Sequence, residues 1–169
     1  MMKTIIYILL LTTFSLTAQG KPSLSVFQDA KFAFMGDEAR GYKAGTLNIV
    51  ARLKMNGNQD KYGYLVVFPE FECAELQGIY RRYSANVGYT FNQLILPKLT
   101  VMPSVGYGWI DRFGLSDYSF SGSVEIAYPL FKHVNLTMLH QFTERSDLGF
   151  LWNDNQIKYS FFVGLEIKL

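Results

Sequence analysis

The last thirteen or so residues alternate between apolar and polar side chains. Every second position is apolar, and only Phe162 interrupts the intervening series; the apolar positions are Ile157, Tyr159, Phe161, Val163, Leu165, Ile167 and Leu169. This period of two predicts a β-strand with one apolar and one polar face. Soluble strands usually have about five or six residues, whereas a tilted strand that crosses a bilayer needs about nine to eleven. We therefore expect the apolar face to contact lipid.

The amino-terminal residues predict export. Lys3 precedes an apolar stretch at residues 5–16 and the small-residue segment 17–20, which is the arrangement of a cleavable secretory signal peptide. We predict a signal peptide at residues 1–20, cut between Ala18 and Gly20, followed by one domain at residues 21–169. No later segment contains the roughly eighteen consecutive apolar residues of a membrane helix. This pattern predicts a periplasmic, secreted or outer-membrane protein.

Composition narrows the possible functions. Cys73 is the only cysteine, so no disulfide can form within the chain. The net charge is +2 and charged residues make up 18% of the chain, without the basic stripe that nucleic-acid binding requires. His133 and His140 are too far apart along a strand to share a metal ion. We predict no nucleic-acid partner, no metal and no cofactor.

About eight segments favour strands and are separated by turn residues. We place them at residues 24–34, 46–55, 62–76, 79–91, 99–112, 118–131, 134–145 and 157–169. The first and seventh connections are long and polar, whereas the second and sixth are short. Outer-membrane barrels have short periplasmic turns and longer external loops. This order predicts periplasmic termini and external loops at residues 36–44 and 147–156.

Four segments alternate cleanly, with small polar residues on one face and large apolar residues on the other, although the first half of the third segment cannot be phased. A soluble barrel of the lipocalin kind also alternates, with its apolar face inward. Small polar side chains suit the narrow lumen of an eight-stranded barrel, and bulky apolar ones suit lipid. We therefore predict an all-β fold, a closed antiparallel up-and-down transmembrane β-barrel of about eight strands.

We expect the first and last predicted strands to pair and close the barrel, because an unpaired sheet edge in lipid leaves backbone hydrogen-bonding groups unsatisfied. The polar faces then bring a set of charges into the lumen: Asp29, Lys31, Arg52, Lys54, Arg82, Glu125, Lys158 and Glu166. These charges predict either an ion pathway or a salt-bridged plug. In so narrow a barrel we favour the plug.

The chain resembles the small eight-stranded outer-membrane β-barrels of Gram-negative bacteria, a group that includes the OmpA transmembrane domain, OmpX, OmpW and the lipid A deacylase PagL. The resemblance includes a carboxyl-terminal insertion signal at Gly164, Ile167 and Leu169. It implies recognition by the barrel-assembly machinery and residence in outer-membrane lipid. The chain departs from the pattern at Phe162, which is usually polar, and at Leu169, which is commonly aromatic.

Members of this class have different functions, and the fold does not choose among them. We predict a structural or surface-interaction role through the external loops, where Phe150 and Trp152 are candidate contacts for an unidentified extracellular ligand. A narrow conduit for small solutes is one alternative. The other is a lipid-modifying enzyme at His140. PagL-like enzymes carry a serine two residues after the histidine, but this chain has Phe142 there, and Glu144 and Ser146 lie too far along the strand.

Overall fold

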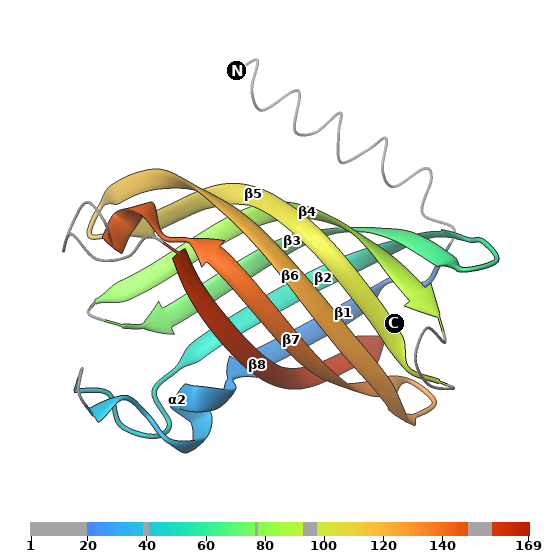
Figure 1. Cartoon of the computed structure of the whole chain (residues 1–169), viewed down its shortest axis with the longest axis horizontal. Coiled ribbons are helices and arrows are strands. Elements are labelled where there is room, and N and C mark those ends of the chain that lie inside the picture. Colours follow the sequence, from blue (N-terminus) through green and yellow to red (C-terminus); the bar gives the residue numbers. More distant parts are fainter. Residues whose placement is uncertain (1–19, 39–40, 77, 93–97, 149–156) are drawn as a thin grey trace, which may run out of the picture.

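The computed structural model describes residues 20–38, 41–76, 78–92, 98–148 and 157–169. Eight antiparallel strands form a closed barrel in which neighbours in sequence pair and β1 pairs with β8 (Figure 1). The elements are β1 (Ser23–Asp29), α2 (Ala30–Phe34), β2 (Asn48–Gln59), β3 (Gly63–Glu75), β4 (Ile79–Asn92), β5 (Thr100–Arg112), β6 (Leu115–Phe131), β7 (Val134–Glu144) and β8 (Ile157–Lys168). The predicted closed, up-and-down barrel is confirmed.

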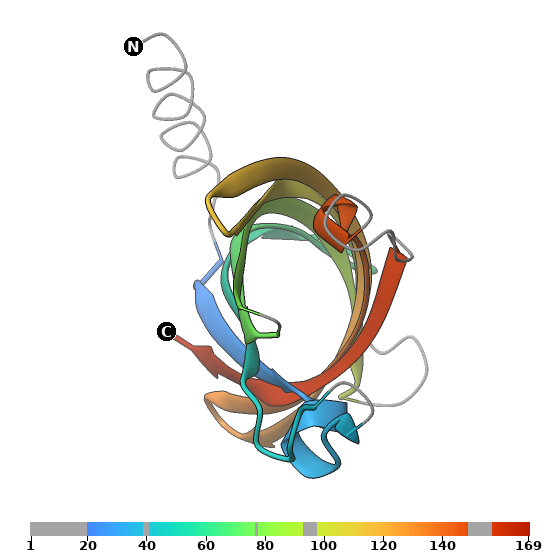
Figure 2. The same cartoon turned by 90° about the vertical axis from the view of Figure 1, so that its left-hand side faces the viewer.

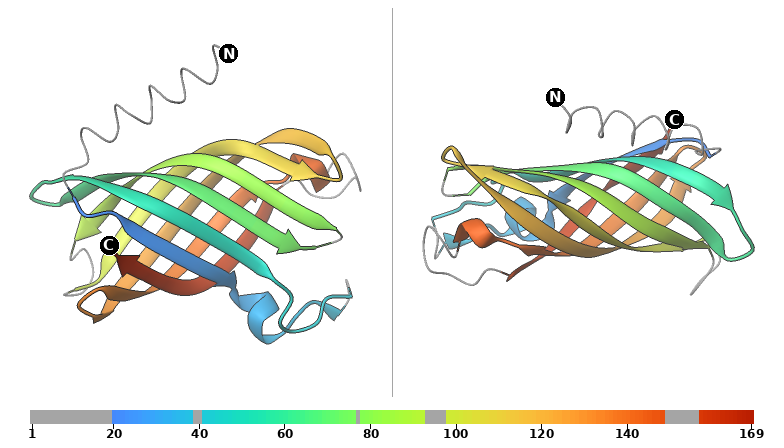
Figure 3. Two further views of the ribbon diagram at one scale, coloured as in Figure 1. Left: turned by 180° about the vertical axis from the view of Figure 1, so that it is seen from behind. Right: turned by 90° about the horizontal axis from the view of Figure 1, so that it is seen from above.

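The two ends of the barrel differ in what they carry. Ser23 pairs with Lys168, so the first strand starts and the last strand ends on the same side of the molecule. We call this the Leu169 end. The opposite end carries α2, which projects past the barrel wall together with the chain that follows it (Figures 1 and 3). We call it the α2 end. The described part of the chain contains no helix long and apolar enough to cross a bilayer.

The polarity of the barrel is inside out compared with a soluble protein. The outward positions of the strands are apolar and exposed, as in Val26, Val105 and Leu165. Inward positions include charged residues such as Arg52 and Arg82, which are at most 1% exposed. Figure 2 shows the ring of strands that separates these two surfaces. This distribution is the one required by a barrel whose outer surface meets lipid and whose interior is polar.

The predicted first strand is wrong beyond Asp29. Residues 30–34 form the helix α2 instead of continuing β1. The side chain of Asp29 caps this helix, because its carboxylate accepts a hydrogen bond from the amide of Phe32 at 3.2 Å. The capping interaction turns the chain out of the barrel wall, and β1 is left with only seven residues.

Tertiary packing explains the two places where the alternation is ambiguous. In β3, Val66 and Phe68 face inward and pack with Met102, so this strand is apolar on both faces near the Leu169 end. Phe162 also faces inward, where it packs with Phe27 and Leu139. The interior therefore contains apolar clusters between its charged groups.

Two glycines on the inward face of β5 allow close packing in the narrow lumen. A Cβ atom at Gly106 would lie 1.7 Å from the side-chain oxygen of Asn86, and one at Gly108 would lie 2.0 Å from the carbonyl oxygen of Tyr83. A side chain can move away, but the backbone of a paired strand cannot. The neighbouring strand β4 therefore requires glycine at position 108, because glycine in a strand allows another backbone to approach closely.

We predict that Gly108→Ala lowers the free energy of unfolding by about 1–3 kcal/mol, because the added methyl group overpacks against β4. Urea unfolding of the refolded barrel, followed by tryptophan fluorescence, measures the change. Ser104→Ala is the control on the same face of β5, and it should cost no more than about 1 kcal/mol for its one hydrogen bond. Equal stability of Gly108→Ala and the wild type would contradict the packing argument.

Candidate functional site

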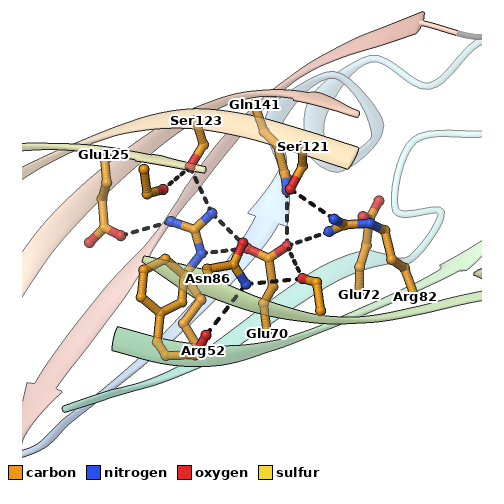
Figure 4. A network of polar contacts seen from close by, with 12 residues as sticks. Arg52, Glu70, Glu72, Arg82, Asn86, Ser121, Ser123, Glu125 and Gln141 are labelled. Carbon is orange, nitrogen blue, oxygen red and sulfur yellow. Dashed lines mark hydrogen bonds and ion pairs between the residues drawn. The ribbon is translucent and has the colours of Figure 1, made fainter. Parts of the chain in front are cut away.

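A network of ion pairs crosses the middle of the lumen, and the carboxylate of Glu70 lies at its centre (Figure 4). One carboxylate oxygen accepts a hydrogen bond from Arg52 Nε at 2.7 Å. The other accepts from Arg82 Nη1 at 2.7 Å and from Gln141 Nε2 at 3.0 Å. Strands β2, β3, β4 and β7 thus meet at one side chain. Glu70 connects parts of the wall that are not neighbours in the sheet.

The two arginines extend the network to the opposite wall. Arg52 Nη1 lies 3.1 Å from Glu125 Oε2 on β6, and Arg52 Nη2 donates to Ser123 at 3.1 Å. Arg82 donates to Ser119 at 2.9 Å and to Ser121 at 2.8 Å, also on β6. The short serine side chains leave room for the long arginines, and together they span the lumen.

Lys54 carries the network toward the Leu169 end. Its ammonium group forms ion pairs with Glu125 and, at 3.0 Å, with Glu166. Glu166 also accepts hydrogen bonds from Ser23 at 2.7 Å and from Asn135 at 2.6 Å. Because Ser23, Glu166 and Asn135 belong to β1, β8 and β7, this carboxylate holds the closing seam of the barrel from the inside.

The network fills the centre of the lumen. The side chains of Arg52, Glu70 and Arg82 are at most 1% exposed. The guanidinium of Arg52 also lies over the ring of Phe68, 4.9 Å from its centroid. Pockets of about 640 and 550 Å³ open at the α2 end and the Leu169 end. The charged residues therefore form a plug between two open mouths.

A second cluster lies at the α2 end. Asp147 accepts hydrogen bonds from Arg112 at 2.9 Å and from Arg145 at 2.8 Å. The guanidinium of Arg145 lies over the ring of Tyr80, 3.7 Å from its centroid. Burial opposes the ionisation of Asp147, but the hydrogen bonds and charges of Arg145 and Arg112 outweigh it and lower the pKa of this carboxyl.

The predicted lumen charges fall into two groups. Five of them share the connected network described above: Arg52, Lys54, Arg82, Glu125 and Glu166. The other three lie near the α2 end. Asp29 caps α2, Lys31 pairs with Asp37 at 2.6 Å, and Lys158 lies on β8 opposite Thr143. The expected approach of Lys31 to the inward face is wrong, because Lys31 belongs to α2 and is largely exposed.

Sequence reasoning missed the central residue, Glu70. Its signal was present in the alternation Glu70-Phe71-Glu72, which places both glutamates on one face. The residues before Glu70 are apolar on both faces of the strand, so the sequence did not show which face points into the lumen. Arg112 and Arg145 were also missed, although their parity matches that of inward residues on β5 and β7.

The residues of the predicted insertion signal lie in the closing seam and at the Leu169 end. Gly164 lies opposite Phe27 in the closing seam, and a Cβ atom there would lie 2.1 Å from the carbonyl oxygen of Val26. Ile167 and Leu169 are exposed at the Leu169 end. The seam thus requires glycine at position 164 for packing. Phe150, Trp152 and the predicted signal peptide, apart from Gly20, lie outside the described residues.

His140 is exposed on the outer wall of β7, between Phe161 on β8 and Val124 on β6. Its ring lies 6.5 Å from that of Tyr159. The two residues considered as partners have other contacts: Glu144 accepts from the amide of Phe120, and Ser146 donates to the carbonyl of Tyr118. The described residues contain no group of three or more metal-binding side chains.

Two solved structures share this architecture. The chain is similar to the outer membrane protein Ail of Yersinia pestis in a phospholipid nanodisc, with 13% identity, a TM-score of 0.58, and coverage of 89% of this chain and 100% of that one. A designed transmembrane β-barrel gives 10% identity, a TM-score of 0.52, and coverage of 89% and 96%. No family model and no curated protein sequence matches the chain. The fold is that of the small eight-stranded outer-membrane barrels.

We predict that Glu70→Gln lowers the free energy of unfolding by about 3–5 kcal/mol, because Arg52 and Arg82 then remain buried without their shared carboxylate. Urea titration of the refolded protein measures this loss. Glu75→Gln provides the control on the same strand, since Glu75 is exposed and should tolerate the change within about 0.5 kcal/mol. Equal effects of the two substitutions would show that the central ion pairs contribute nothing specific.

The depressed pKa of Asp147 predicts a pH-dependent contribution to stability. A carboxyl whose pKa is lower in the folded state stabilises above its ordinary pKa and loses this contribution as pH falls through the folded value. Asp147→Asn should therefore cost about 2 kcal/mol at pH 7. The difference from the wild type should shrink only below the ordinary value of 3.8. Urea unfolding at several pH values tests this, with the exposed Asp117→Asn as control; a difference independent of pH would contradict it.

Proposed function

We propose that this protein is an outer-membrane barrel that acts as a rigid, non-enzymatic scaffold for interactions at the cell surface. The observation that carries the proposal is the contrast between the filled lumen and the connection that follows β1. The centre of the barrel is occupied by Arg52, Glu70 and Arg82. The described residues of this connection, 30–38 and 41–47, in contrast contact one another and display the apolar side chains of Phe34 and Met35 at the α2 end.

The connection after β1 is held by several specific contacts. Lys31 forms an ion pair with Asp37 at 2.6 Å. Asp37 pairs with Tyr42 through backbone hydrogen bonds, and the ring of Tyr42 meets that of Phe32 edge to face at 5.8 Å. A loop that is already ordered loses less conformational entropy when it binds a partner. This order supports a recognition role.

The membrane orientation that fits this function places the α2 end outside the cell. β1 would then begin, and β8 would end, at the periplasmic face. The barrel-assembly machinery would recognise Gly164, Ile167 and Leu169 from that side. The fold shared with the outer membrane protein Ail supports the location in the outer membrane. The long connections at residues 36–44 and 147–156 would face the medium.

The two alternative functions have less support. A conduit requires a continuous water path, and the Glu70 network occupies the position through which it would run. A lipid-modifying enzyme requires a nucleophile and an acid beside His140. The side chains of Glu144 and Ser146 instead bond the backbone of β6.

We predict that replacement of residues 36–44 and 147–156 by glycine-serine segments of equal length abolishes adherence of expressing cells to epithelial monolayers and to one another. The barrel itself should persist, because its strands and central network are unchanged and the loss of Asp147 removes only about 2 kcal/mol. Heat-dependent mobility on a detergent gel checks folding. Adherence equal to that of the wild type would contradict the proposed function.

Orientation is checked with the same cells. A membrane-impermeant maleimide should label Lys43→Cys in intact cells and label Asn58→Cys, in the β2–β3 hairpin, only after permeabilisation. Both substitutions are made in a Cys73→Ala background, which removes the single native thiol. The reverse labelling pattern would place the α2 end in the periplasm and overturn the proposal.

A further inference from the structure

The pocket at the Leu169 end has a chemistry that the proposed surface function does not use. Its volume is about 550 Å³, which lies within the usual range of ligand sites, about 300–1,000 Å³. One wall is the hairpin between β2 and β3, and the other is the turn between β6 and β7 together with the end of β8. In the closed order of eight strands these two connections lie on opposite sides of the mouth. The two walls carry different groups, and each restricts what the pocket can bind.

The first wall carries amide side chains. β2 runs to Gln59, whereas β1 begins at Ser23, opposite Lys54, so the end of β2 continues past the start of β1. The hairpin that it forms with β3 projects from the Leu169 end of the barrel (Figures 1 and 3). Asn56 has the same parity as Lys54 and therefore continues the inward face of the strand. Asn56, Asn58 and Gln59 all line the pocket.

This hairpin is held in place by contacts at both of its ends. At its tip, the carboxylate of Asp60 accepts hydrogen bonds from two backbone amides of the turn, at 2.7 and 2.9 Å. The hydroxyl of Tyr89 on β4 donates to the same carboxylate at 2.8 Å. At its base, Asn56 Nδ2 donates to the carbonyl of Lys21 at 2.7 Å. A surface that is already ordered loses little conformational entropy when it binds a ligand.

The opposite wall is cationic. Lys132 lies in the β6–β7 turn, and Lys168 is the last residue of β8. The amide of Lys168 donates to the carbonyl of His133 at 2.9 Å, which joins the turn to the end of β8. Lys21, in the segment before β1, adds a third ammonium group to the lining. All three lysines are exposed, so their charges are available to an anion in the pocket.

The lysines are not cancelled by the floor of the pocket. Glu166 is the one acidic side chain among the described residues that line it, and it is only 8% exposed. Its carboxylate forms an ion pair with Lys54 at 3.0 Å and accepts a hydrogen bond from Asn135 at 2.6 Å. The charge of Glu166 is therefore balanced from within the lumen, and the rim keeps an excess of positive charge.

The two walls together match a peptide better than a simple anion. A lysine ammonium group binds a carboxylate or a phosphate as a point charge. An amide side chain offers both donors and an acceptor, as a peptide group does. A phosphate satisfies the amide donors but leaves the amide oxygens facing further acceptors. Because single exposed ion pairs contribute only about 0–1 kcal/mol, binding here requires several contacts made at once.

We propose that the pocket at the Leu169 end binds a short, extended acidic peptide segment. The hairpin amides pair with its backbone, and Lys21, Lys132 and Lys168 pair with its carboxylates. This inference goes beyond the proposed surface function, because it concerns the opposite end of the barrel and requires neither adherence nor the α2 end.

The test uses the full chain without its predicted signal peptide, refolded in uncharged maltoside micelles at low salt. A rhodamine-labelled peptide of four glutamates with an amidated carboxyl end is titrated with protein, and fluorescence anisotropy measures binding. One peptide should bind per barrel, and the glutamine peptide of equal length should bind at least tenfold more weakly. Lys132→Gln combined with Lys168→Gln should also weaken binding at least tenfold. Heat-dependent gel mobility confirms that each variant is folded.

The matched control removes two charges from the same end of the barrel. Lys61→Gln combined with Lys98→Gln changes two exposed lysines that are not among the residues lining the pocket, and it should change the affinity less than threefold. A loss equal to that of the lining pair would show attraction to the net charge alone and would overturn the proposal.

A further probe separates peptide recognition from anion binding. Tripolyphosphate carries comparable charge but no peptide groups, and it should displace the labelled peptide at least tenfold less well than the unlabelled glutamate peptide does. Asn58→Leu removes an amide at nearly constant volume; it should weaken the glutamate peptide severalfold and leave tripolyphosphate unchanged. The proposal is overturned if tripolyphosphate competes as well as the peptide, or if Asn58→Leu binds the peptide like the wild type.

Discussion

The pairing of β1 with β8 is the constraint on which the rest of this structure depends. A sheet whose outer surface meets lipid has no water to satisfy the backbone groups of an open edge, so its first and last strands must join. Here the seam is short, because β1 leaves the wall at Asp29 to enter α2. Gly164 brings the two strands close, and Glu166 of β8 accepts hydrogen bonds from Ser23 of β1 and from Asn135 of β7.

Closure around only eight strands determines how the interior is filled. The lumen is narrow, so a few long side chains are enough to span it. Arg52 and Arg82 reach across from β2 and β4 to the serines of β6; Glu70 forms ion pairs with both, and Glu125 supplies a second carboxylate to Arg52. The aromatic rings of Phe27 and Phe68 pack on the guanidinium of Arg52. Charge, hydrogen bonding and packing are thus satisfied together, which a buried ion pair requires if it is not to destabilise the fold.

The filled centre makes the two ends of the barrel independent of each other. Because the Glu70 network separates the two mouths, binding at one end has no direct path to the other. The α2 end has the more varied chemistry: the exposed apolar side chains of Phe34 and Met35, the Asp147 cluster and an open pocket of about 640 Å³. These features support the proposed interaction with partners outside the barrel over transport through it.

Most of the strands were predictable from the sequence, because a residue's parity decides whether it faces lipid or lumen and this physical demand repeats along each strand. The final segment shows this most clearly, since its predicted start at Ile157 is where β8 begins. The break at position 78 was also predictable, and Gly78 has the positive φ of 95° that glycine adopts readily. The parity of Arg52, Arg82 and Glu125 placed them in the lumen, but parity says nothing about which carboxylate each arginine meets.

By itself, the sequence determined the closed, inside-out barrel, because alternation and the exclusion of polar backbone from lipid leave few other solutions. Only the tertiary structure decided the rest. Glu70 became the centre of the plug because four strands converge on it, and Phe162, which its parity places in the lumen, is accommodated there because it packs with Phe27 and Leu139. The end of β1 depended on one cap at Asp29. Such outcomes arise from contacts between residues far apart in the chain, and no local pattern records them.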